Sequence, residues 1–344
     1  FSDAMRVSRV VRAVQQRWGV IFDIDGVLIQ GYKPIPGAAE ALCALDDARV
    51  PYAFMTNGGG VLEAQKAADL ATRLGRSEPF GANRMLLSHT PFRALADRFQ
   101  DRRVLIVGAS CTADVAASYG FDFTSGLAVT TPQIVSGTPE ICPFPPLATT
   151  ALPGVNVNAP DAPAIEAVLI FYEPNDWGTE LQVITDAVAG GRPMGSGDKQ
   201  VAEVWASNAD FLWRAGYPVS RLGNGAFLES LKAVWRRRTG HDLQIQECGK
   251  PHKVQFDAAE AMLAEVAGVS TSSFSRIYMI GDNPAADIRG ANAAEGPWRS
   301  ILVRTGVYQG PSHFTGDAAE APWRLEPDVR EAVRRLLAES HGEP

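Results

Sequence analysis

The stretch GVIFDIDGVLIQG, residues 19–31, decides how this chain folds and what it can do. A short apolar run ends in two carboxylates, Asp23 and Asp25, and a glycine follows at once. Residues two apart on an extended backbone point to the same side, and a buried carboxylate is costly unless a cation or a hydrogen-bond donor meets it. The stretch is therefore either a turn held by the aspartates or a strand that delivers both acids to a binding site at the edge of a sheet.

The size and composition of the chain limit its class. Its 344 residues favour two domains, and its 46% hydrophobic and 21% charged content is that of an ordinary globular protein. A net charge of -7 gives no electrostatic case for binding nucleic acid, and no apolar run approaches the ~20 residues that span a bilayer. The four cysteines form no CxxC pair, which argues against a zinc site or a disulfide framework and indicates a reducing compartment.

The first residues bear on where the protein works. Residues 6–17, RVSRVVRAVQQR, carry four arginines and no acidic residue. This pattern fits a solvated amphipathic helix that leads into the first strand, and it also fits the end of a mitochondrial transit peptide. The expected location is therefore mitochondrial or cytoplasmic.

Apolar runs alternate with Ala- and Leu-rich segments along most of the chain, which is typical of a parallel α/β sheet. Residues 84–222 have a strand and helix rhythm of their own. We expect a core built from residues 1–83 and 223–344, interrupted by an inserted α/β domain. Strands are expected at 20–24, 52–55, 276–280 and 300–303 in the core and at 104–107, 167–171 and 201–206 in the insertion, and helices at 36–49, 62–74, 179–189 and 253–266.

Two further features lie in the insertion. Residues 139–163 are rich in Pro, Ala, Asn and Thr, and loops of this length are uncommon in compact domains. We expect either a surface excursion or a lid over a functional site. Trp205 and Trp213 are expected in the core of the insertion rather than on a base-stacking platform.

Two short motifs put polar groups near the ends of predicted strands. MTNGGG, residues 55–60, sets a hydroxyl, an amide and glycine N–H groups before a helix, which suits either a helix cap or a phosphate cradle of Thr56, Asn57 and Gly58. GKP, residues 249–251, places Lys250 on a loop, where its charge can offset a carboxylate and a phosphoryl group.

The last motif explains the two aspartates of the opening stretch. MIGDNPAAD, residues 279–287, adds two acids, Asp282 and Asp287, after another apolar strand. Carboxylate oxygens gathered beside a phosphate imply Mg2+, which would make Asp23 and Asp25 tolerable next to Asp282 and reduce repulsion between an anionic nucleophile and its substrate. The motifs together favour phosphoryl transfer, in which one aspartate attacks phosphorus while its neighbour moves a proton.

The set DIDGVL, TN, GKP and GDNPAAD resembles the four motifs of the haloacid dehalogenase (HAD) superfamily, most of whose members are Mg2+-dependent phosphatases. GVLIQGYKPIPGAAEAL and the single lysine in GKP resemble class IIA, in a eukaryotic and often mitochondrial branch. The resemblance covers nearly the whole chain. It implies a Rossmann-like, doubly wound parallel sheet with an inserted α/β cap of the C2 type.

The resemblance also implies the catalytic roles. Asp23 would be the nucleophile that forms an aspartyl-phosphate, and Asp25 would be the general acid and base. Mg2+ would be bound by the side chains of Asp23 and Asp282 and by the backbone carbonyl of Asp25. Lys250 would neutralise charge in the site.

The remaining motif residues would hold the substrate or support the site. Thr56 and the Asn57–Gly58 backbone would hold the phosphoryl oxygens, and Asn283 and Asp287 would support the metal and the lysine. The chain has TNGGG where relatives often have TNN and Ser, so its phosphate loop is expected to rely more on backbone. SNADF, residues 207–211, resembles the stretch that closes the cap near the substrate.

These features predict a phosphatase that hydrolyses a small phosphorylated metabolite. A catalytically weak relative that serves as a binding or scaffold protein is one alternative. An enzyme linked to glycerophospholipid metabolism is another. Cap-mediated homodimers are common in relatives, so a homodimer is an open expectation, and the sequence leaves the substrate itself undetermined.

Overall fold

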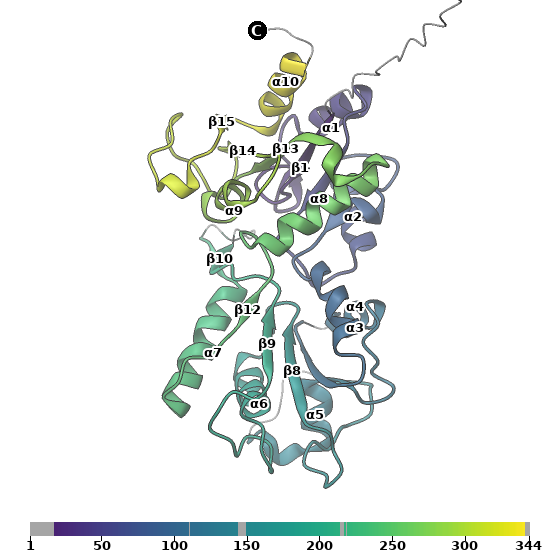
Figure 1. The fold of residues 1–344 in the computed structure, drawn as a ribbon, viewed down its shortest axis with the longest axis vertical. Coiled ribbons are helices and arrows are strands. Elements are labelled where there is room, and N and C mark those ends of the chain that lie inside the picture. Colours follow the sequence, from purple (N-terminus) through teal and green to yellow (C-terminus); the bar gives the residue numbers. More distant parts are fainter. Residues whose placement is uncertain (1–16, 110, 144–148, 214–216, 218, 341–344) are drawn as a thin grey trace, which may run out of the picture.

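Two parallel β-sheets form the framework of the chain, one in each half of the view in Figure 1. The computed structural model describes residues 17–109, 111–143, 149–213, 217 and 219–340. The Arg-rich segment at residues 6–17 therefore lies outside the described residues except for Arg17. In the described part of the chain, no helix is both long and apolar enough to cross a membrane.

The first sheet has six parallel strands and contains the opening stretch near its centre. Ile21 packs on one face with α8 and α9, whereas Val20 and Phe22 pack on the other with α1, α2 and α10. The strand order is β15 (Arg324–Glu326), β14 (Trp298–Val303), β13 (Phe274–Gly281), β1 (Arg17–Phe22), β4 (Tyr52–Met55) and β5 (Met85–Leu86). The helices are α1 (Ala38–Asp47), α2 (Glu63–Arg73), α8 (Lys253–Ala267), α9 (Arg289–Ala293) and α10 (Val329–Ser340).

The second sheet has five parallel strands and is also covered on both faces. Helices α5, α6 and α7 contribute to the hydrophobic cluster on one face, and α3 and α4 to the cluster on the other. The strand order is β12 (Gln246–Glu247), β9 (Glu203–Ala206), β8 (Ile165–Ile170), β6 (Arg103–Val107) and β7 (Ala128–Thr130). The helices are α3 (Arg93–Arg98), α4 (Thr112–Ser118), α5 (Thr131–Gly137), α6 (Trp177–Ala189) and α7 (Asn224–Thr239).

Two antiparallel hairpins lie outside the sheets. The first joins β2 (Ile29–Gln30), at the end of the opening stretch, to β3 (Lys33–Pro34). The second joins β10 (Leu212–Trp213) to β11 (Arg221–Leu222) within the inserted part. The prediction of a doubly wound α/β core with an α/β insertion is confirmed by these two parallel sheets.

The packing places the limits of the insertion differently from residues 84 and 222. β5 pairs with β4 in the first sheet, although it falls inside the expected insertion. Helix α7 falls outside that range, yet its Phe227 and Trp235 are buried in the cluster of the second sheet, and β12 pairs with β9. We therefore propose that the inserted cap runs from the end of β5 to the end of β12.

The Pro-rich segment is anchored in the cap at a few of its described residues. Val157 is buried among the residues of the α5, α6 and α7 cluster, and the Val155 N–H donates a hydrogen bond to the Gln133 carbonyl. Residues 144–148 of this segment lie outside the described residues.

Replacing Trp235 in α7 tests the proposed cap limit. Trp235 is 1% exposed, so Trp235→Ala should lower the free energy of unfolding of the cap by about 3–5 kcal/mol through lost burial and a cavity. Urea unfolding followed by circular dichroism measures this change. Val234→Ala, at an adjacent position that is 41% exposed, is the matched control and should change the stability by less than about 1 kcal/mol. Equal effects of the two changes would remove α7 from the cap core.

Candidate active site

A buried lysine joins two acids at the carboxyl end of the first sheet. Asp23 directly follows β1, and Lys250 lies on the loop that precedes α8. The Lys250 ammonium donates hydrogen bonds to Asp23 Oδ1 at 2.5 Å and to Asp287 Oδ1 at 2.6 Å. Burial disfavours the charged form of Lys250, but the two carboxylates outweigh it and raise the pKa of the ammonium. The lysine is therefore held as a cation between two acids.

Asp287 also organises the turn that carries Asp282. Its Oδ2 accepts hydrogen bonds from the N–H groups of Asp282 and Asn283, at 3.1 and 3.0 Å. Gly281 leaves room for this contact, because a β-carbon there would overlap the Asp287 side chain. Asn283 accepts a hydrogen bond from the Ala285 N–H and caps the next turn. Both Asp287 oxygens are thus engaged within the protein.

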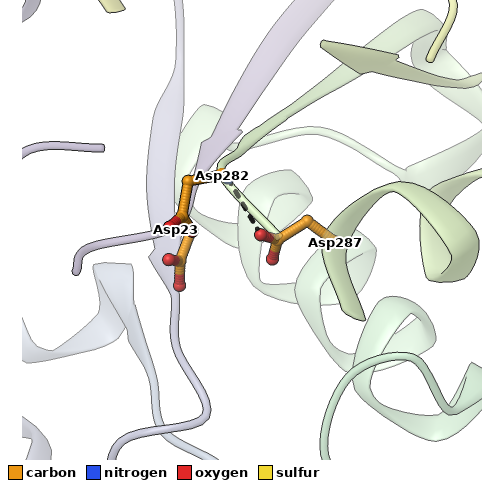
Figure 2. Close-up of side chains that lie close together, drawn as sticks. All are labelled: Asp23, Asp282 and Asp287. Atoms are coloured by element: carbon orange, nitrogen blue, oxygen red, sulfur yellow. Dashed lines mark hydrogen bonds between the residues drawn. The ribbon is translucent and has the colours of Figure 1, made fainter. Parts of the chain in front are cut away.

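Asp282 directly follows β13 and lies beside Asp23 (Figure 2). The Val307 N–H donates a hydrogen bond to Asp282 Oδ2 at 2.5 Å. Gly26, at φ +88°, and Gly306 flank the carboxylate so closely that a β-carbon at either position would overlap it. Burial raises the pKa of Asp23 well above its usual range and the pKa of Asp282 to about 7.

The acidic cluster fits a divalent cation. One carboxylate oxygen from each of Asp23, Asp282 and Asp287 lies within 4.8 Å of the others (Figure 2). Among the described residues, no hydrogen bond reaches Asp23 Oδ2 or Asp282 Oδ1. Burial raises the pKa values of Asp23 and Asp282, and a small divalent ion bound by their hard carboxylate oxygens would stabilise the charged forms. Residues 23 and 282 are therefore close enough to share one ion, with Asp287 behind them.

Asn57 ties the loop after β4 to both domains. Its Nδ2 donates hydrogen bonds to the Lys250 carbonyl and to Asp210 Oδ1, each at 3.0 Å, and its Oδ1 accepts one from the Lys250 N–H at 2.8 Å. Thr56 Oγ1 accepts a hydrogen bond from the Gly58 N–H at 2.9 Å. The Asn57 side chain thus fixes the backbone of the lysine, a contact that the TN motif alone did not reveal.

The predicted site residues line one cavity of about 530 Å³. It is closed at one end by the buried acids and lysine, while Asp25 is an exposed residue on its wall. The described residues of the Pro-rich segment contribute nothing to the lining, so they provide no lid. The nine predicted site residues that line the cavity are Asp23, Asp25, Thr56, Asn57, Gly58, Lys250, Asp282, Asn283 and Asp287.

The cap supplies the wall that faces these residues. Tyr172 and Glu173 follow β8, and Asn208 and Asp210 follow β9, so the carboxyl ends of the cap strands border the cavity. The sequence placed residues 207–211 near the substrate, but it missed Tyr172 and Glu173. Their signal is the same as for Asp23: polar groups directly after an apolar strand.

The two tryptophans of the cap differ in their surroundings. Trp205 packs against the cluster that α3 and α4 cover, as expected for a core residue. Trp213 is 43% exposed and lines the cavity, so its expected place in the cap core is wrong. The physical reason is that β10 belongs to a two-stranded hairpin outside the five-stranded sheet.

Comparisons with known proteins agree with this architecture. The haloacid dehalogenase-like hydrolase family model matches residues 20–122, and the HAD-hydrolase-like model matches residues 247–332. A magnesium complex of a glycerol phosphate phosphatase from Mycobacterium tuberculosis has a similar fold, with a TM-score of 0.62 and 22% identity over 92% of this chain and 76% of its own. The second match begins within β12, where the proposed cap ends.

Two curated relatives extend over most of the chain. A mitochondrial hydrolase of Saccharomyces cerevisiae is 32% identical, covering 96% of this chain and 98% of its own length. A cardiolipin synthase (CMP-forming) / mitochondrial hydrolase fusion protein of Schizosaccharomyces pombe is 35% identical over 87% of this chain, which spans about half (51%) of that longer protein. By these matches, the chain belongs to the haloacid dehalogenase-like hydrolases.

Proposed function

We propose that this hydrolase is a Mg2+-dependent phosphatase that cleaves a small-molecule phosphomonoester through an aspartyl-phosphate. The observation that carries the proposal is the meeting of Asp23, Lys250, Asp282 and Asp287 at the closed end of one cavity. These residues come from three separated segments of the chain, and a divalent cation bound beside Lys250 would offset the charge of the acids and of an incoming phosphoryl group.

Asp23 and Asp25 would divide the reaction into two steps. In the first, an Asp23 carboxylate oxygen forms a bond to phosphorus while the bond from phosphorus to the leaving oxygen breaks, and Asp25 gives that oxygen its proton. In the second, Asp25 takes a proton from water, whose oxygen attacks the aspartyl-phosphate and releases inorganic phosphate and free Asp23. The exposed position of Asp25 on the cavity wall supports this exchange with leaving group and water.

The other residues would hold the phosphoryl group and its counter-charge. Thr56 and the Asn57–Gly58 backbone would bind phosphoryl oxygens, and Lys250 would balance their charge. Mg2+ would be held by the Asp23 and Asp282 side chains and the Asp25 carbonyl, where it would reduce repulsion between nucleophile and substrate. The magnesium complex of the similarly folded mycobacterial phosphatase supports this choice of ion.

The two curated relatives bear on the location of the chain and on the alternative functions. The yeast relative is named as a mitochondrial hydrolase, which supports a mitochondrial location for this chain. The fusion of the fission-yeast relative to a cardiolipin synthase favours a link to glycerophospholipid metabolism as the second candidate function. A binding or scaffold role is the remaining alternative, and a homodimer through the cap stays a prediction.

Asp23→Asn should abolish turnover while leaving the fold in place. The amide is isosteric but carries no charge to attack phosphorus, so Mg2+-dependent hydrolysis of para-nitrophenyl phosphate should fall at least about 1000-fold. Asp257→Asn, a surface position whose one ion pair among the described residues is with Lys253, is the control and should keep the parent rate. If the folded parent protein turns over none of a panel of phosphomonoesters, the scaffold alternative replaces the proposal.

Binding of Mg2+ should be visible without any reaction. A ligand that binds only the folded state at about 100 times its dissociation constant adds about 2.7 kcal/mol to the free energy of unfolding. The parent should therefore melt at a higher temperature with Mg2+ than after EDTA treatment, as measured by scanning calorimetry. Asp282→Asn should lose most of that difference, whereas Asp257→Asn should retain it. An undiminished difference in Asp282→Asn would place the metal elsewhere.

A further inference from the structure

Glu173 and Asp210 form an acidic wall on the cap side of the cavity, where the leaving group of the substrate would lie. Glu173 follows β8 and Asp210 follows β9, and both line the cavity across from the buried acids of the core. Glu173 is half-buried, so its carboxylate is only partly screened by water. Its negative charge is therefore available to whatever part of a substrate extends from the phosphate toward the cap.

In the described part of the chain, no basic side chain forms an ion pair with this wall, and the charge of Lys250 acts on Asp210 only from a greater distance. Among the described residues, no lysine or arginine lies within 4.0 Å of the Glu173 or Asp210 carboxylate as an ion pair. Asp210 already accepts a hydrogen bond from Asn57. Lys66, on α2, lines the cavity from the core side but pairs with neither acid. Burial raises the pKa of Glu173, the Asn224 backbone N–H opposes that rise, and the negative charge of Asp210 adds to it.

Resting on the proposed phosphatase function, we infer that Glu173 is a specificity-determining residue that selects for a positively charged leaving group. The preferred substrates would be phosphomonoesters of amino alcohols, and phosphomonoesters of hydroxy acids would be rejected. Like charges brought together at a partly desolvated site repel strongly, whereas an ammonium group would be paired there. Tyr172 and Trp213 line the same cavity, and aromatic rings attract ammonium groups.

The test is a series of esters that differ in end-group charge and hardly in size. We would measure kcat/KM for ethanolamine phosphate, ethyl phosphate and phosphoglycolate, and then for the same end groups on longer alkyl chains. The parent should prefer the ammonium ester to the carboxylate ester by well over tenfold at the chain length that reaches Glu173. Glu173→Gln should reduce that ratio by about tenfold, which corresponds to 1.4 kcal/mol, and Glu173→Lys should invert it.

The ratio is taken within each variant, so it does not depend on how much of the protein folds. Glu166→Gln is the matched control, because it makes the same Glu-to-Gln change at a position on β8 that does not line the cavity. It should leave the ratio unchanged. A parent without charge preference, or a Glu173→Gln ratio equal to that of the parent, would overturn the inference alone, provided para-nitrophenyl phosphate is hydrolysed. Absence of hydrolysis for every ester, para-nitrophenyl phosphate included, would overturn the phosphatase proposal itself.

Discussion

The ion pairs of Lys250 with Asp23 and Asp287 are the interactions on which the rest of the site depends. Three carboxylates lie within 4.8 Å of one another in a buried pocket, and each would resist ionisation there without compensation. The lysine supplies the compensation within the protein, and its own charge is maintained by the same two acids. The backbone N–H groups that bind Asp287 and Asp282 then fix the directions of these carboxylates.

The sequence predicted this end of the molecule well because its signals are local. Asp23, Lys250 and Asp282 each sit directly beside an apolar run or on a short loop, so the strand ends could be located from periodicity alone. The approach of the Val307 N–H to Asp282 was not predictable, since nothing in the side-chain pattern near residue 307 marks a backbone donor. Glu173 was missed because the sequence does not show that the edges of the two sheets border one cavity. Without that arrangement, an acid after a cap strand does not indicate a site.

The proposed limits of the cap differ from the limits expected from the sequence for another reason. Helix α7 has apolar residues that indicate packing against a sheet, but they do not indicate which of the two sheets it covers. Strand β5 has two residues, too few to show a period, although it completes the edge of the core sheet. Long-range packing decided both cases, through Phe227 and Trp235 on one side and the pairing of Met85 with Phe54 on the other.

The bonds of Asn57 have a consequence for how caps could be exchanged among hydrolases of this family. The loop that leaves β9 and the loop that carries Lys250 meet on this one amide, and Asn208 adds a bond to its backbone. A chimera that imported a foreign cap without residues 207–210 would lose the bonds from Asp210 and Asn208 that help to position Asn57 beside the lysine's backbone. A cap can therefore be exchanged as a unit only if the loop after β9 and the loop that carries Lys250 are transferred with it.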